Sequence, residues 1–285
     1  MSYQRKHNTG YILRICGIAA LGGILFGYDT AVISGAIEAL KTYFNLSPAE
    51  TGWAVSNVVI GCVVGAFAAG PLAARWGRKK ALMLAALLFT VSAVGAALAP
   101  TFTWLAIYRI IGGLAVGIAA TVSPMYMSEV SPKDMRGRAL SMQQFAIVFG
   151  QIVIFYVNFK IASLASEAWL VEMGWRWMFA SGVIPCILFC ILVFVIPESP
   201  RWNVMMGRDD QALAMLTKVS NAAHAQNLLK EIKDSLQQDQ QQRHRKLNYG
   251  DVRVRFILFV GCMIAMLQQV TGVNVMMYYL SLIHI

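Results

Sequence analysis

Long apolar stretches alternate with short polar ones along the whole chain. Seven runs of about 20 residues or more carry few charges, and several are interrupted by glycine; they cover residues 11–32, 52–73, 81–99, 103–128, 139–162, 174–196 and 254–283. A run of this length and character predicts a helix that crosses the hydrocarbon core of a bilayer. The pattern therefore predicts an all-α integral membrane protein.

The spacing of the runs divides the chain into three parts. Six runs follow one another through short loops, and a polar stretch separates them from the seventh. Within this stretch, residues 209–219 and 225–238 have helical apolar spacing, and Asp209 and Asp210 are placed to cap the first of the two helices. We expect a six-helix bundle, a cytoplasmic helical insert and a seventh spanning helix, over residues 1–197, 198–253 and 254–285.

Composition and charge agree with this interpretation. Hydrophobic residues make up 58% of the chain and charged residues only 13%, about half of what soluble domains carry. The net charge of +10 could indicate a nucleic-acid partner, but its distribution argues against one. If the N-terminus lies inside, most Lys and Arg fall on the same side of the membrane, and the positive-inside rule makes that side cytoplasmic. We expect a multi-pass protein of the cell membrane.

Features of enzymes, metal sites and processed leaders are missing from the sequence. The first run has no small-residue cleavage site behind it, so we expect it to be retained. All five cysteines lie in apolar runs and are interpreted as small buried residues without disulfides. Cys186 and Cys190 are four residues apart, but no His or second Cys pair joins them. We expect no cofactor, no metal and no catalytic activity.

Five motifs carry a resemblance to a known family. "GPLAARWGRKK" (70–80) looks like the loop signature of the major facilitator superfamily. The other four resemble signatures of its sugar porter branch and follow in family order: "PMYMSEVSPKDMRGR" (124–138), "GWRWMF" (174–179), "PESPRW" (197–202) and "QQVTGVNVMMYY" (268–279). "FGYDTAVISG" and "QFAIVFGQ" are similar to bacterial proton-coupled xylose and inositol symporters. The resemblance implies the six-helix N-terminal half of a major facilitator fold.

The chain departs from the family pattern at two points. The loop signature has an Asp where this chain has Ala74, so one partner of the charge network that the family forms there is lacking. Family members have twelve spanning helices, whereas this sequence stops in the seventh with "LSLIHI". We therefore expect an N-terminal fragment, by truncation or by a sequence artefact, that needs the missing C-terminal half for a complete transport path.

Two charges stand alone within spanning runs. A charge at the centre of a spanning helix costs about 2.5–3.5 kcal/mol, so it is usually paired or functional. Asp29 lies near the outer end of the first run and Arg109 a turn or two into the fourth; at 1.5 Å per residue both reach a similar depth and could pair. The pair could be purely structural, or Asp29 could cap a helix end in water. The resemblance implies that Asp29 carries the coupled proton.

Amides and aromatic residues mark a candidate sugar site. Gln144 and Gln151 lie two helical turns apart on the fifth run, and three more amides lie near the middle of the seventh. Primary amides both donate and accept hydrogen bonds, which suits the hydroxyls of a neutral polyol, although amides also join helices in membranes. The resemblance implies sugar contacts from Phe26, Gln144, Gln151, Gln268, Gln269, Asn274 and Tyr278.

The remaining charges next to the spans are candidates for a gate. They flank the 2–3 and 4–5 loops and follow the sixth run: Arg75, Arg78, Glu129, Arg136, Arg138, Glu198 and Arg201. A network of ion pairs among them could hold the cytoplasmic side closed. Single surface pairs contribute only about 0–1 kcal/mol, so solvated positive-inside charges are the alternative interpretation.

The sequence as a whole predicts a secondary active transporter of a monosaccharide or polyol. We expect proton symport by alternating access, in which two halves rock around a midplane site. An uncoupled sugar facilitator is one alternative, and a membrane sugar sensor that does not transport is another. The expected partners are a small sugar or polyol, protons and the lipid bilayer.

Overall fold

The computed structural model describes residues 7–164, 166–243 and 252–272. The described residues are almost entirely helical; one isolated antiparallel bridge joins His7 and Ser220. The elements, in order, are α1 (Thr9–Phe44), α2 (Pro48–Trp76), α3 (Arg78–Ala97), α4 (Phe102–Val130), α5 (Arg136–Leu164), α6 (Glu167–Trp169), the π-helix η1 (Leu170–Gly174), α7 (Trp175–Ser181), α8 (Val183–Val195), α9 (Pro200–Met205), α10 (Asp209–Val219), α11 (Ala222–Arg243) and α12 (Val252–Val270).

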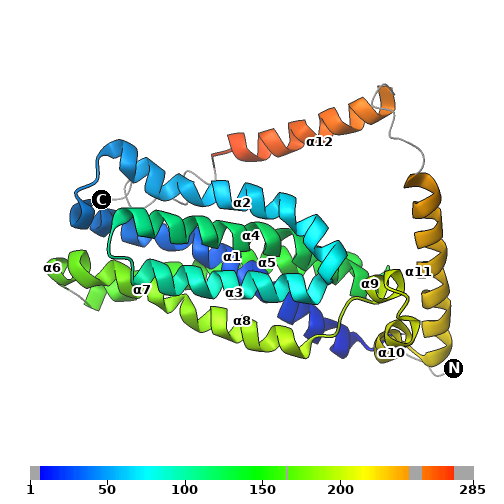
Figure 1. The fold of residues 1–285 in the computed structure, drawn as a ribbon. Helices are drawn as coiled ribbons and strands as arrows, with labels where there is room; N and C mark the ends of the chain where they lie inside the picture. Colours follow the sequence, from blue (N-terminus) through cyan, green and yellow to red (C-terminus); the bar gives the residue numbers. More distant parts are fainter. Residues whose placement is uncertain (1–6, 165, 244–251, 273–285) are drawn as a thin grey trace.

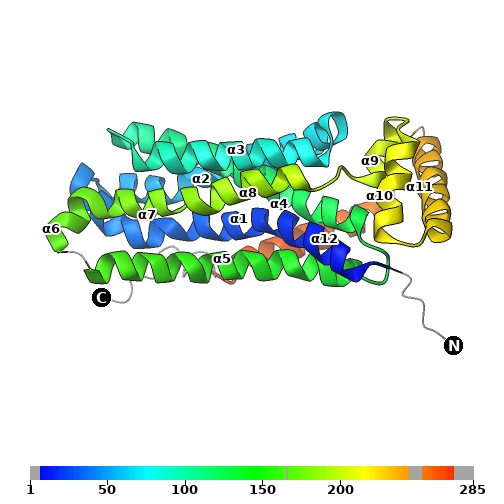
Figure 2. The same ribbon diagram turned by 90° about the horizontal axis from the view of Figure 1, so that it is seen from below.

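Six helical segments of the described chain are long and apolar enough to cross a membrane. They are α1 to α5 and the segment Glu167–Val195, which comprises α6, η1, α7 and α8. These segments lie side by side as a bundle, with the start of α1 and α9–α11 at one end and α6 at the other (Figures 1 and 2). The predicted all-α membrane architecture is therefore confirmed.

The first spanning helix is longer than the predicted run of residues 11–32. It continues to Phe44 and ends at Asn45, which adopts a left-handed conformation with φ 50°. The extension passes exposed Glu38 and Lys41, which ended the apolar run in the sequence. Buried residues nevertheless continue on one helical face through Ile33, Ile37 and Leu40. Packing on this single face maintains the helix beyond the apolar run.

Close helix crossings depend on glycine at two places. A Cβ atom at Gly113 of α4 would overlap the carbonyl oxygen of Val58 in α2, and one at Gly27 of α1 would overlap that of Ile147 in α5. Small residues let membrane helices approach to backbone contact. These crossings fix which faces of α1 and α4 point toward their neighbours.

The sixth span begins earlier than the predicted run and is interrupted. It starts at Glu167 instead of residue 174, passes through the π-turn η1 and breaks at Gly182 between α7 and α8. Pro185 follows in α8, and because proline has no N–H, the carbonyl of Ser181 lacks its usual helical donor. The break lies beside Asp29, as described below.

The polar insert is held against the bundle. α10 has the predicted bounds, and Met215 and Val219 belong to the same buried cluster as Ile12 and Ile15 of α1. The expected capping by Asp209 and Asp210 is wrong: Arg208 is the N-cap residue and no side chain caps the helix. The two carboxylates lie in the first turn, where their negative charges interact favourably with the positive end of the helix dipole.

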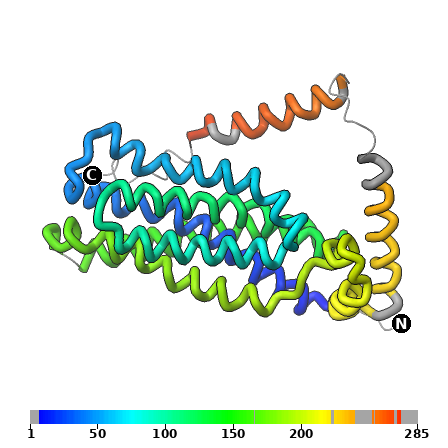
Figure 3. Tube along the Cα trace, viewed as in Figure 1, coloured from blue at the N-terminus to red at the C-terminus, as the bar shows by residue number. Residues whose placement is uncertain are grey.

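The described start of the seventh run, residues 254–272, lies in and just after α12, and this helix lies apart from α2 and the rest of the bundle (Figures 1 and 3). Nearly all of its described side chains are exposed. The described part of α12 therefore contributes little to the buried core.

Candidate functional site

The two isolated charges of the spans meet inside the bundle. Arg109 of α4 is 1% exposed, and its Nη1 lies 3.9 Å from Oδ2 of Asp29 in α1. The same nitrogen donates a hydrogen bond to the main-chain carbonyl oxygen of Asp29 at 3.0 Å. The Arg109 guanidinium carbon also lies 5.9 Å from the centre of the Phe179 ring. The structure thus brings together the pair that the sequence placed at one depth; their role remains a prediction.

This buried pair is loosely bonded. Within the described chain, Oδ2 of Asp29 and both Nε and Nη2 of Arg109 have no hydrogen-bond partner, although all three atoms are buried. Buried polar atoms in proteins are almost always hydrogen-bonded, so each exception suggests a strained or functional group. The site can accept a further ligand such as a water molecule or a proton without breaking an existing hydrogen bond.

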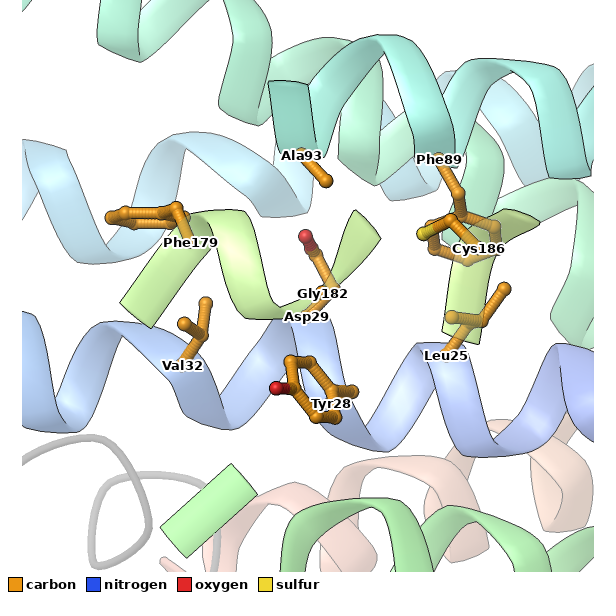
Figure 4. Close-up of a pocket in the computed structure, with 9 residues that line it drawn as sticks. All are labelled: Leu25, Tyr28, Asp29, Val32, Phe89, Ala93, Phe179, Gly182 and Cys186. Atoms are coloured by element: carbon orange, nitrogen blue, oxygen red, sulfur yellow. The ribbon is translucent and has the colours of Figure 1, made fainter. Parts of the chain in front are cut away.

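A small cavity opens at Asp29. Its volume is about 20 Å³, and its walls come from α1, α3 and the α7–α8 segment. Figure 4 shows the Asp29 side chain between Ala93 of α3 and Gly182 at the helix break. A cavity of this size holds about one water molecule if enough polar groups face it.

The predicted amides of the fifth run lie on α5 near α1. Gln144 is exposed and Gln151 is half-buried, as is Phe26 of α1. The neighbouring Gln143 is instead buried, with both amide atoms unpartnered, and lies against Gly23 of α1. The two predicted amides therefore remain available to a ligand, whereas Gln143 is part of the helix contact.

The predicted sugar residues of the seventh run cannot be placed. The side chains of Gln268 and Gln269 lie outside the described part of the structure, as do the whole residues Asn274 and Tyr278. Their proposed contacts with the sugar remain predictions.

A charge network joins the loop after α2 to the end of the sixth span. Nη2 of Arg78 lies 2.7 Å from Oε1 of Glu129 on α4, and both side chains are nearly buried. One carboxylate oxygen of Glu198 accepts the main-chain N–H groups of Arg78 at 2.9 Å and Lys79 at 3.1 Å. Glu198 thereby caps α3, whose N-cap residue Gly77 has no side chain to do so. Three of the predicted gate residues are thus in direct contact.

The other four predicted gate residues lie outside this core of the network. Arg136 donates from Nε to the carbonyl oxygen of Ser128 at 3.0 Å. Arg75 and Arg138 are exposed, and no ion pair joins either one to a described residue. Arg201 lines a larger cavity of about 540 Å³ between the ends of α2 and α4 and the insert.

The network also contains contacts that the sequence did not predict. Ser199 donates its hydroxyl to Glu129, and the indole N–H of Trp202 donates to the carbonyl oxygen of Ala74 at 3.0 Å. Lys79 donates from Nζ to the carbonyl oxygen of Phe194 at 2.7 Å. The "PESPRW" motif contained the signal, because a carboxylate and a hydroxyl there directly follow a span. Ala74 takes part in the network only through its main-chain carbonyl oxygen, because it has no carboxylate like the Asp of the loop signature.

The insert is tied to the 4–5 loop by a separate ion pair. Nζ of Lys133 lies 2.8 Å from Oε2 of Glu231 on α11. The hydrogen bond and the positive charge of Lys133 hold the pKa of Glu231 below its usual value. Since both side chains are well exposed, the pair adds at most about 1 kcal/mol to stability.

Comparison with known proteins gives consistent matches over nearly the whole chain. The family model described as "Sugar (and other) transporter" matches residues 15–284. The chain is 40% identical to the D-xylose-proton symporter of Escherichia coli K12 over 96% of its own length and 60% of that protein. It is 39% identical to the arabinose-proton symporter of Bacillus subtilis, covering 96% of this chain and 59% of the relative.

A solved structure agrees with these matches. The proton:xylose symporter XylE bound to 6-bromo-6-deoxy-D-glucose superposes with a TM-score of 0.87 at 41% identity, over 95% of this chain and 62% of that one. The chain therefore spans about 60% of the length of the relatives it matches.

Proposed function

The chain belongs to the sugar transporter family, and from this premise we propose that it forms the substrate-binding first half of a proton-coupled transporter for a monosaccharide or polyol. The observation that carries the proposal is the buried Asp29–Arg109 pair. A carboxylate held inside a bundle beside a permanent positive charge, with an unpartnered oxygen, can gain and lose a proton with little other rearrangement. Intramembrane ionisable residues commonly serve as such proton relays.

The exposed faces of α2 and α5 fit a two-part transporter. Phe67 of α2 is 81% exposed, and Phe145 and Tyr156 of α5 are 72% and 62% exposed. In a membrane protein such residues face lipid or another part of the transporter. We infer that residues 1–197 form one rocking unit, that 198–253 form the insert and that 254–285 begin the second unit, which the transport path needs.

The sugar would bind beside α5. Gln144 and Gln151 would donate to and accept from its hydroxyls, and Phe26 would cover an apolar face. We infer that Gln268, Gln269, Asn274 and Tyr278 contribute further contacts to the sugar. The named relatives take xylose and arabinose, which favours a pentose or hexose as the substrate.

The network around Arg78, Glu129 and Glu198 would be the cytoplasmic gate. Its nearly buried ion pair and the capped helix end connect three spans in one arrangement, so a rocking motion would have to break them together. Arg75, Arg136, Arg138 and Arg201 would extend the network to the second unit. This assignment puts the N-terminus and the insert in the cytoplasm and the protein in the cell membrane.

The alternatives make different predictions. An uncoupled facilitator has no use for a titratable residue at position 29, and a sensor would bind sugar without moving it. Uptake of labelled sugar against a gradient, followed with an external pH electrode, separates all three. The measurement requires the protein from the complete reading frame, because the chain covers only about 60% of its relatives.

The sugar site is tested by one substitution with a matched control. Gln151→Ala should weaken sugar binding about threefold to tenfold, because one hydrogen bond to a neutral group contributes about 0.5–1.5 kcal/mol. Gln143→Leu is the control: this amide is buried and unpartnered, so its loss should leave binding unchanged. Isothermal titration with xylose and arabinose measures both. Equal affinities for wild type and Gln151→Ala would assign the amide to helix packing.

A further inference from the structure

Asp29 lies on the side of α1 that faces away from α5. Gly27 contacts α5, because a Cβ there would overlap the carbonyl oxygen of Ile147. At 3.6 residues per turn, two residues rotate the side chain by about 200°, so Asp29 points almost opposite to Gly27. Its carboxylate faces α3 and the α7–α8 segment instead. The proposed proton carrier and the amides of α5 are therefore separated by α1 itself.

The cavity on this side has apolar walls. Phe89 and Ala93 line it from α3, and Phe179, Gly182 and Cys186 line it from the sixth span (Figure 4). Gly182 contributes no side chain, and the helix break at this residue leaves the space open. The volume of about 20 Å³ is enough for one water molecule.

The carboxylate of Asp29 and the hydroxyl of Tyr28 are the oxygen-bearing side-chain groups among the residues that line the cavity, and they can hold this water. The Asp29 side chain is 16% exposed, and its Oδ2 has no partner in the described chain. Ser92 is close by, since a Cβ at Gly112 would approach both its Oγ and, at 3.3 Å, Oδ1 of Asp29. Ser92 lies next to the carboxylate but not in the cavity wall, and it donates to the carbonyl oxygen of Tyr108 at 2.8 Å. A water needs two to four such partners to remain in a buried site.

We propose that this cavity is a water site through which Asp29 gains and loses its proton, on the side of α1 opposite the sugar amides. The inference rests on the proposed proton symport. The water arrives as hydronium, transfers one proton to the Asp29 carboxylate and leaves as neutral water. Release reverses these steps: neutral water takes the proton and leaves as hydronium. The proton then reaches Asp29 from the side of α1 that faces away from α5 and its two amides.

The titratable groups around Asp29 do not replace the water. Arg109 of α4 keeps its charge and exchanges no proton at physiological pH. The thiols of Cys62 on α2 and Cys186 on α8 lie close enough to interact with Asp29 electrostatically, but a thiol is only a weak donor. The hydroxyl of Tyr28 is engaged with Ser181 at 2.7 Å. Among the described residues, none offers Asp29 a mobile proton.

The test fills the cavity from two walls without touching the sugar amides. Ala93→Leu extends into it from α3, and Gly182→Ala adds a methyl group that would lie 3.4 Å from the Tyr28 ring. Val94→Leu, on an exposed position of the same helix, is the control for expression. In the protein from the complete reading frame, both filling variants should bind sugar normally but lose sugar-driven proton uptake about tenfold. Normal proton uptake in both, at wild-type protein levels, would overturn the water site.

A second measurement needs no filling variant. Infrared spectroscopy detects the C=O band of the protonated Asp29 carboxyl group, which is identified by its loss in Asp29→Asn. This band should shift in D2O, because the proton exchanges for deuterium through the water site, even when saturating sugar is bound. If bound sugar abolishes this shift, the proton path runs through the sugar cavity and the proposal is refuted. If wild-type protein shows no sugar-dependent proton movement at all, the proposed symport fails instead, which keeps the two failures distinct.

Discussion

Replacing Asp29 with asparagine separates the shape of the buried pair from its titration. At the observed 3.9 Å between Arg109 and Asp29, and with an effective dielectric constant of 20, the lost Coulomb attraction is about 4 kcal/mol. The actual cost should be smaller, because the hydrogen bond of Arg109 to the main-chain carbonyl oxygen of residue 29 survives. Asp29→Asn should therefore fold, with somewhat reduced expression.

The transport deficit should be much larger than the folding deficit. One proton moving down 100 mV supplies about 2.3 kcal/mol, which corresponds to roughly 50-fold accumulation of sugar in a one-to-one symporter, since 1.36 kcal/mol is a factor of ten. Without a titratable group, Asp29→Asn should only equilibrate sugar. It should still exchange labelled for unlabelled sugar, because the α5 amides lie on the other side of α1.

Proteoliposomes with an imposed potential provide the assay for the complete protein. Accumulated sugar and external pH are recorded together, and the amount of protein in the membrane is measured for each variant. Glu38→Gln is the control, because this carboxylate lies on the same helix and is exposed. Accumulation above the equilibrium ratio by Asp29→Asn, at normal protein levels, would refute the proton-carrier role and leave a structural ion pair.

Three further predictions concern the scaffold and the gate. Gly113→Ala should destabilise the bundle by about 1–3 kcal/mol, because its Cβ would overlap a carbonyl of α2, whereas Gly70→Ala, with open space around it, should not; thermal unfolding in detergent measures both. Glu129→Gln should leave Arg78 without its charge partner and increase thiol labelling of Cys16, which is buried beside Ser131, and unchanged labelling would argue against a gate. Lys133→Met should raise the pKa of Glu231 toward its usual value, because the hydrogen bond and the positive charge of Lys133 that lower it are lost; carboxyl NMR measures the change. Folding lowers the pKa of Glu231. The contact therefore stabilises the folded state at pH values above the pKa of the unfolded state, and this stabilisation is lost as the pH falls through the pKa of the folded state.

Much of the fold follows from one-dimensional patterns. Apolar runs identified the six spans, and amphipathic spacing identified α10 to the residue, because burial on one helical face is written directly in the sequence. The meeting of Asp29 and Arg109 was also predictable, since charges in a span are rare and helix rise fixes their depth. Family motifs added the amides of α5, whose role as sugar contacts stays a prediction.

Contacts between segments that are far apart in the sequence were harder to predict. Glu198 caps α3 from 120 residues away in the sequence, and no residue near Gly77 indicates that this carboxylate is the capping partner. Asp209 illustrates the opposite error: a residue suited to N-capping lies in the first turn of α10 and pairs with Lys233 of α11. In both cases tertiary contact overrode the local preference.

The direction in which Asp29 points illustrates why depth alone did not define the site. Sequence spacing gives the rotation between Gly27 and Asp29, but it does not say which of them faces α5. That choice is made by backbone contact, because only glycine at position 27 lets the carbonyl of Ile147 come so close. Once α1 is docked in this way, Asp29 must face α3 and the break at Gly182. Asp29 and the α5 amides lie on opposite sides of α1, so the proposed coupling between proton and sugar runs through this helix, which also carries Phe26 one turn before Asp29.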